Sequence, residues 1–228
     1  MQSNQPATAL SEHRWLRIDN PLELRVGDGA LLNLDDTWIW DFWIADTGKE
    51  YHIYFLKASK EYRDPLTRHD LIRNPDRRQK RSSIGHAVSK DLISWELLPD
   101  ALHHGEPGTF DDLATWTGSV LQGPDEIWYM FYTGISSESE GKLERIGLAT
   151  SDDLYSWEKR QDLSILSADH RWYEKLGDSS WPNETWRDPW VFRDPDGDGW
   201  HMYITARSRD GSVDDRGVIG HAHSENLL

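Results

Sequence analysis

Two aspartates occupy matching places in a pattern that the chain repeats three times. The copies read TWIWDFW at residues 37–43, TWTGSVL at 115–121 and TWRDPWV at 185–191. They place Asp41, Gly118 and Asp188 in register, and tryptophans flank both aspartates. Indole rings suit the C–H faces of sugars, and a pair of carboxylates is what cleavage of a glycosidic bond requires. The pattern therefore indicates sugar chemistry.

Further elements of the repeat predict four short strands in each copy. An aromatic and aliphatic run follows each copy, at residues 51–56, 128–132 and 200–204. The third element reads IGHA at 84–87, IGLA at 146–149 and IGHA at 219–222, and a Trp-Glu pair follows it in the first two copies. Repeated four-stranded units are typical of a β-propeller, in which the first strand of each blade lines a central channel. We therefore expect Asp41 and Asp188 to face one pocket, with Gly118 leaving room beside them.

The sequence thus predicts an all-β chain, a β-propeller of four-stranded antiparallel blades with about three blades present of an expected five. Residues 1–37 are an N-terminal segment leading into the propeller, which occupies residues 38–228. Blade 1 covers about 38–100, blade 2 about 115–162 and the shortened blade 3 about 185–228. Because a propeller that does not close exposes strand edges and an apolar blade face, we expect the chain to be incomplete.

The composition favours a neutral ligand. The 228 residues carry a net charge of −15, which repels nucleic acid and anionic membranes, so the expected partner is a neutral oligosaccharide or disaccharide. With 37% apolar residues, the chain is long enough to bury a sizeable core. It has no cysteine, which excludes disulfides and thiolate chemistry, and residues 1–20 lack the pattern of a signal peptide. We expect a cytoplasmic protein that needs no cofactor.

Several connections between the predicted strands can also be interpreted. Residues 89–95 and 151–157 share a Ser-x-Asp-Leu pattern before a tryptophan, which predicts two equivalent hairpin turns with the tryptophan packed between blades. The basic segment 57–81 is interpreted as a solvated loop, with a wall over the substrate mouth as the alternative. Residues 168–176, ended by Gly177, predict a short helix.

An acidic run at residues 194–199, DPDGDG, fits the first half of a calcium-binding loop. A full loop of that kind needs a glutamate at its twelfth position, which is Thr205, and a helix afterwards, where this sequence predicts a strand. We therefore interpret the run as an acidic hairpin turn and assign no metal site. His86, His221 and His223 fall on the repeated third strands, where alternation makes them wall or interface residues, with metal ligation as the minor alternative.

The motifs at residues 40–43, 116–119 and 187–189 resemble those of a clan of five-bladed propeller glycosidases. This clan holds invertases, fructanases and levansucrases, with arabinan and xylan enzymes as a sister group. The resemblance implies that Asp41 is the nucleophile and that Asp188 stabilises the transition state by binding fructosyl hydroxyls. The substrate-binding residues that we assign are Arg187 beside Asp188, Trp116 and Ser119 in the second motif, and Trp40 and Trp43 around Asp41.

The predicted function is hydrolysis or fructosyl transfer at β-fructofuranosides such as sucrose or fructans, by a retaining double displacement. The glutamate that serves these families as general acid has no match after Asp188, so we expect it to lie beyond this chain, with Glu184 as the fallback within it. Glu225 belongs to a turn repeat and should face solvent. Two alternatives stay open: an inverting arabinofuranosidase or xylosidase, in which Asp41 activates water, and a noncatalytic sugar-binding propeller.

Overall fold

The structure is a computed structural model that describes residues 32–60, 76–163 and 165–228. In this part of the chain, three antiparallel sheets contain the repeated strands. The first sheet comprises β1 (Thr37–Asp46), β2 (Tyr51–Ser59), β3 (Ser83–Ser89) and β4 (Glu96–Leu102). The second comprises β5 (Ala114–Gln122), β6 (Trp128–Ile135), β7 (Glu144–Ser151) and β8 (Glu158–Lys159). The third comprises β9 (Trp186–Arg193), β10 (Trp200–Arg207) and β11 (Gly217–Ser224). Two short helical elements are α1 (Asp76–Gln79) and η2 (Val213–Asp215).

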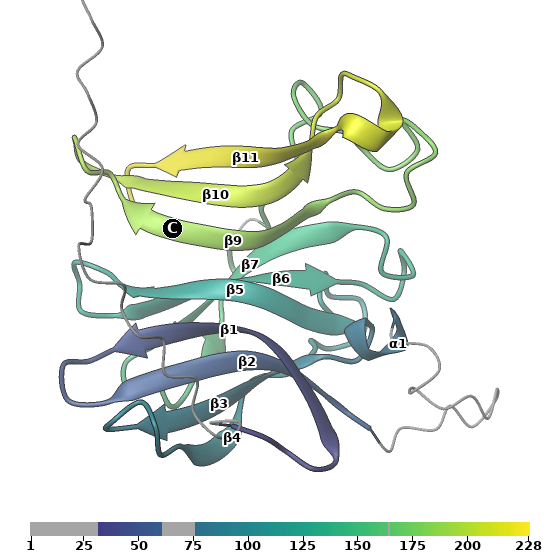
Figure 1. Cartoon of the computed structure of the whole chain (residues 1–228). Helices are drawn as coiled ribbons and strands as arrows, with labels where there is room; N and C mark the ends of the chain where they lie inside the picture. The colour runs from purple at the N-terminus through teal and green to yellow at the C-terminus, as the bar shows by residue number, and fades with distance from the viewer. Residues whose placement is uncertain (1–31, 61–75, 164) are drawn as a thin grey trace, which may run out of the picture. The chain divides into compact units, whose positions relative to one another are not determined.

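Each sheet is an antiparallel meander in which consecutive strands are hydrogen-bonded neighbours. The predicted four-stranded blades are confirmed for the first two sheets, and the third shows three strands within the described residues. We call the sheets blades 1, 2 and 3. Figure 1 shows them following one another, with β1 against β5 and β5 against β9. The first strands of the blades are therefore neighbours, as a propeller requires.

Apolar side chains fill the two interfaces between blades. The cluster at blades 1 and 2 is formed by Trp43, Ala45, Tyr54, Leu56, Ile84, Leu102, Met130, Tyr132, Ala149 and Leu154. The cluster around blades 2 and 3 is formed by Tyr129, Ile146, Leu148, Ala168, Trp186, Val191, Met202, Ile204, Ala206 and Leu227. Full burial of one such side chain stabilises a fold by about 1.5–3 kcal/mol. This packing fixes the first strands relative to one another.

The two predicted hairpin turns have the same hydrogen bonds. Ser89 Oγ accepts the N–H of Leu92, and Ser151 Oγ accepts the N–H of Leu154, each at 2.9 Å. Both leucines have a left-handed backbone, with φ of 62° and 68°. In the first turn the N–H groups of residues 94 and 93 stabilise the Asp91 carboxylate and lower its pKa to about 2. The equivalence of these turns is confirmed.

A buried histidine pair lies in blade 1 and is covered by blade 2. His52 Nδ1 on β2 lies 2.9 Å from His86 Nε2 on β3, and both residues are at most 1% exposed. The Tyr155 ring, from the second hairpin turn, packs edge-on against His52 with 4.9 Å between ring centroids. Burial is the main cause that lowers the pKa of both imidazoles, to about 4 for His86. The expected interface role of His86 is confirmed, because the pair is neutral and sealed.

Two predictions about the connections have different outcomes. The expected helix at 168–176 is wrong: one turn closes through Asp169, which accepts the N–H of Tyr173 at 2.9 Å, and the next residue, Glu174, bonds to the backbone of Arg207. Pairing with the end of β10, the central strand of blade 3, has overridden the local helical signal. The basic segment 57–81 lies partly outside the described residues. Glu225 is exposed, as expected.

Among the described residues, no helix combines the length and the apolar character that crossing a membrane demands.

Acid should destabilise this fold through the buried histidine pair. A histidine in the unfolded chain takes up a proton near pH 6.5, whereas folded His86 does so only near pH 4. The unfolded state therefore binds the proton first, and stability should fall as the pH drops through this window, by about 3 kcal/mol from His86 at its lower end. Urea unfolding at several pH values measures this loss.

The matched variants are His86→Leu and His103→Leu. Blade 2 carries Leu148 at the place of His86 in the repeat, so leucine suits the position, and His86→Leu should flatten the pH dependence. The His103 side chain is 68% exposed, and its replacement should leave the pH dependence unchanged. An equally steep acid loss in His86→Leu and the parent chain would show that the pair is not the cause.

Candidate active site

The first strands of blades 1 and 3 each carry a β-bulge at an aspartate. Pairing of β1 with β2 skips Asp41, and pairing of β9 with β10 shifts across Asp188 and Pro189. Both aspartates have a left-handed backbone, with φ of 40° for Asp41 and 57° for Asp188. Such a conformation costs a non-glycine residue about 1–3 kcal/mol and is found preferentially at functional sites. A bulge also re-aims the side chain that it carries.

Blade 2 also has a β-bulge in its first strand, at Thr117. In β5, Trp116 pairs with Thr133 and Gly118 pairs with Tyr132, which leaves Thr117 as the extra residue. The expectation that Gly118 matches the aspartates and opens the pocket is therefore wrong by one position. A Cβ atom on Gly118 would lie 2.1 Å from the carbonyl oxygen of Phe131, so the glycine is required by the close approach of its own blade.

Thr133 connects the bulges of blades 2 and 3. Its hydroxyl donates to the carbonyl oxygen of Thr117 at 3.1 Å and accepts the backbone N–H of Asp188 at 2.9 Å. The Thr117 hydroxyl in turn donates to Asp41 Oδ2 at 2.8 Å. Backbone groups released from the ladder by a bulge need other partners, and here Thr133 of blade 2 supplies them to its own blade and to blade 3. The structure thus brings Asp41 and Asp188 together through two threonines.

The electrostatics of Asp188 show the same convergence. Burial is the main cause that raises its pKa, and the negative charge of Asp41 raises it further. The Arg187 guanidinium, with Nε 3.3 Å from Asp188 Oδ2, and a hydrogen bond from Thr205 oppose this effect. Asp188 therefore holds its proton to a higher pH than a free carboxyl group does, and Arg187 limits that rise.

Glu144 anchors the arginine and was not expected from the sequence. Its buried carboxylate lies 3.0 Å from Arg187 Nη1 and accepts the backbone N–H of Trp186 at 3.0 Å. Asn183 donates to the same carboxylate. Burial raises the pKa of Glu144, and Arg187 is the strongest opposing influence. Glu144 stands at the first residue of β7, in a Glu-Arg pair that gives no signal of such a role.

The aromatic residues Trp40 and Trp116 lie beside the end of the basic segment. The Arg78 guanidinium carbon lies 4.9 Å from the centroid of the Trp40 ring, which is a cation–π contact. Trp116 Nε1 donates to the carbonyl oxygen of Gln79 at 2.6 Å. Arg78 Nε is buried and has no partner among the described residues. α1 therefore borders Trp40, next to Asp41, and brings the Arg78 guanidinium with it.

Trp43 and Ser119 are both buried in packing contacts. Trp43 is 4% exposed and packs in the core beside Tyr54, with 6.2 Å between ring centroids. Ser119 is 3% exposed, and its hydroxyl accepts the N–H of Val191 at 3.2 Å, which connects blade 2 to blade 3. The assignment of these two residues as substrate contacts is corrected, since both serve packing between or within blades.

Glu184, the fallback acid, is held in a buried ion-pair network. Its carboxylate lies 2.7 Å from Arg145 Nη1 and 2.6 Å from Lys175 Nζ, and it accepts the N–H of Leu176. Two cationic side chains and a backbone N–H engage this carboxylate, so it is not free to reach the leaving oxygen of a substrate. This placement argues against Glu184 as a general acid.

A cavity of about 640 Å³ lies beside blades 2 and 3, away from the two aspartates. Its lining includes Leu148, Val191 and Met202, and its acidic residue Asp111 is paired with Lys159. Neither Asp41 nor Asp188 lines it. We therefore place the candidate site at the bulges and not in this cavity.

The fold and the paired, bulged aspartates define a propeller domain with a dicarboxylate site. The model of the family described as "Glycosyl hydrolases family 32 N-terminal domain" matches residues 73–216. The chain therefore belongs to this family.

Several known proteins are similar to parts of the chain. Beta-fructofuranosidase 1 of Zea mays is 34% identical over 85 residues, which is 36% of this chain and 12% of the maize protein. The structure of an inulosucrase from Halalkalicoccus jeotgali bound to kestose superposes with a TM-score of 0.61 at 24% identity, covering 87% of this chain and 52% of the other. Fructan 1-exohydrolase IIa from Cichorium intybus gives 0.58 at 21%, covering 85% and 31%. The chain thus matches about an eighth of the maize relative's length.

Loss of the Thr133 hydroxyl should destabilise the fold, because it leaves the Asp188 N–H and the Thr117 carbonyl without that partner. Thr133→Val should lower the free energy of unfolding by about 1–3 kcal/mol. Thr115→Val is the matched control, since Thr115 is equally buried and its hydroxyl has no hydrogen-bond partner in the described part of the chain. That change should be neutral or stabilising. Urea unfolding of both variants decides, and equal effects would show that the Thr133 link carries no stability.

Proposed function

We propose that the protein acts on β-fructofuranosides such as sucrose or fructans, by hydrolysis or by fructosyl transfer. Three observations support this: the family to which the chain belongs, the beta-fructofuranosidase name of the maize relative, and the convergence of Asp41 and Asp188. The last carries the proposal. Two carboxylates held at strained bulges on the first strands of blades 1 and 3 suit a reaction in which positive charge develops at an anomeric carbon.

In the proposed mechanism, Asp41 attacks the anomeric carbon and Asp188 binds fructosyl hydroxyls. The Thr117 hydroxyl orients the Asp41 carboxylate through its 2.8 Å hydrogen bond and leaves the other carboxylate oxygen for the attack. Arg187, held by Glu144, favours the charged form of Asp188. Water or a second sugar then releases the fructosyl group, with overall retention of configuration.

The general acid of this mechanism is not assigned to a described residue. Glu144 and Glu184, the two buried glutamates of this region, are both engaged by arginines. A retaining glycosidase needs its acid about 5–5.5 Å from the nucleophile. We therefore propose that this chain supplies the nucleophile and the sugar-binding carboxylate.

Binding and covalent trapping should separate the two aspartates. Kestose should quench the tryptophan fluorescence of the chain, because Trp40 borders Asp41. Asp188→Ala should weaken this binding at least tenfold, because it removes the acceptor for the sugar hydroxyls. Asp41→Ala should retain binding but lose all covalent labelling by a slow fluorinated fructosyl substrate. Asp152→Ala, on an exposed turn, is the control and should behave as the parent chain.

Other outcomes would redirect or end the proposal. Binding of arabino-oligosaccharides without labelling at Asp41 would favour the inverting alternative, in which that aspartate activates water. Retention of sugar binding in Asp188→Ala, together with labelling in Asp41→Ala, would contradict the proposed roles of both residues.

A further inference from the structure

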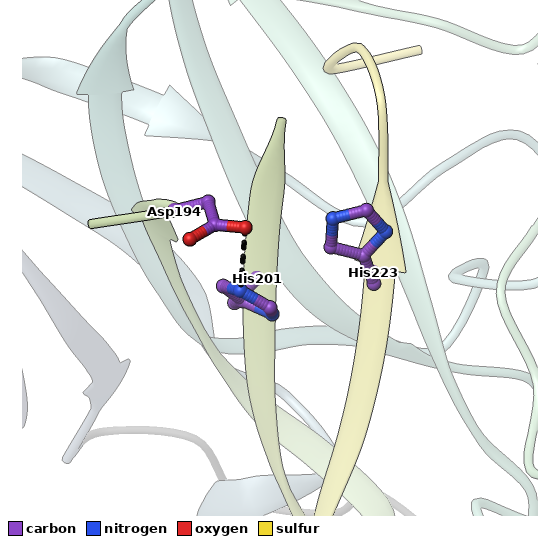
Figure 2. Close-up of side chains that lie close together, drawn as sticks. All are labelled: Asp194, His201 and His223. Carbon is purple, nitrogen blue, oxygen red and sulfur yellow. Dashed lines mark ion pairs between the residues drawn. The ribbon is translucent and has the colours of Figure 1, made fainter. Parts of the chain in front are cut away.

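A cluster of potential metal ligands lies in blade 3, apart from the candidate active site. Asp194 follows β9, His201 is on β10 and His223 is on β11. One ligand atom from each residue lies within 4.8 Å of the other two. Figure 2 shows the three side chains converging at one end of the blade, with the ion pair between Asp194 and His201 drawn as a dashed line.

Strand register and a tight turn bring these three residues together. His201 and His223 are direct cross-strand partners, so both side chains project from the same face of the sheet. The hairpin turn closes when the N–H of Asp194 bonds to the carbonyl oxygen of Gly199 at 3.0 Å. Gly199 has φ of 116°, and a Cβ atom there would lie 3.1 Å from His223 Nε2. A side chain at position 199 would crowd His223 and strain the backbone, so the cluster depends on the glycine there.

Neighbouring groups already orient two of the three ligands. Asp194 Oδ1 accepts the N–H of Asp196 at 2.9 Å, which leaves Oδ2 facing His201 Nε2 at 3.3 Å. The other ring nitrogen of His201, Nδ1, lies 2.8 Å from His221 Nε2. A histidine that binds metal through Nε2 needs an acceptor for its Nδ1–H, and His221 provides one. Asp194 and His201 thus each have a hydrogen-bond partner that holds the orientation of the side chain.

Blade 1 offers an internal comparison, because it carries the same row of three side chains, a carboxylate followed by two histidines. Glu50 Oε1 lies 3.4 Å from His52 Nε2, and His52 Nδ1 lies 2.9 Å from His86 Nε2. There Tyr155 donates to Glu50 and packs on His52, and within the described residues no third metal ligand joins them. In blade 3 the corresponding row of side chains is more exposed to solvent, since Asp194 and His201 are only partly buried. There His223 joins Asp194 and His201 as a third potential ligand.

We propose that Asp194, His201 and His223 bind a divalent transition-metal ion of the zinc type, with water completing the coordination. Two imidazoles and one carboxylate suit zinc better than calcium, which prefers oxygen ligands. Two ligand atoms on a tetrahedral zinc ion with bonds of about 2.0 Å lie roughly 3.3 Å apart. The Asp194–His201 pair already has this separation, and the exposed His223 ring, with 4.9 Å between its centroid and that of His201, completes the set. The ion would tie all three strands of blade 3 together.

Zinc titration of the metal-free chain tests the proposal. Competition with a chromophoric chelator at neutral pH should show one ion bound per chain. His223→Ala and Asp194→Asn should each weaken binding at least tenfold, while His103→Ala, which removes an exposed histidine outside the cluster, should not. Substitution with Co²⁺ should give the visible absorption of a low-coordinate nitrogen and oxygen site, which a merely structural histidine would not produce.

Saturating zinc should raise the thermal unfolding temperature of the parent chain by several degrees and that of His223→Ala by much less. The thermal unfolding temperature of each variant with a chelator present measures any loss of stability that does not come from zinc binding. Absence of stoichiometric binding, or equal affinity in the parent chain, His223→Ala and Asp194→Asn, would overturn the proposal.

Discussion

The candidate site depends on one repeated irregularity, a β-bulge in the first strand of every blade. A regular strand turns successive side chains to opposite faces and pairs every backbone group with its neighbour. The bulge interrupts both features at Asp41, Thr117 and Asp188. It re-aims three side chains and releases backbone groups that side-chain hydroxyls must satisfy. Thr133 provides these hydrogen bonds for two of the three bulges.

This constraint explains why strain and packing occur together. Left-handed aspartates are unfavourable in isolation and persist only where the surroundings hold them. Here the surroundings are two apolar blade interfaces and polar links between blades, such as Ser119 to Val191 and Tyr54 to the carbonyl oxygen of Leu154. The same interfaces hold buried charges in pairs, as Glu144 with Arg187 shows. Rigid blades therefore position the two carboxylates.

The sequence could predict the blades, because the strand pattern and the hairpin turns recur with the same residue types. It could also single out Asp41 and Asp188, since acidic residues are costly in an inner strand. It could not locate the bulge in blade 2, because one extra residue leaves the spacing of the repeat almost unchanged. For this reason the repeat pattern matched Gly118 to the two aspartates, whereas the structure places Thr117 at the bulge. Trp43 follows the bulge at Asp41, so the face of the sheet to which its side chain points depends on where the bulge lies. The sequence pattern alone does not give that position.

The most direct measurement of the central claim is the pKa of Asp188 in the presence and absence of the Asp41 charge. Carboxyl ¹³C NMR titration of the parent chain should place this pKa above that of a free aspartate, and Asp41→Asn should lower it. Asp125→Asn, on the turn between β5 and β6, should leave it unchanged. A pKa of Asp188 that does not respond to Asp41→Asn would contradict the convergence of the two carboxylates.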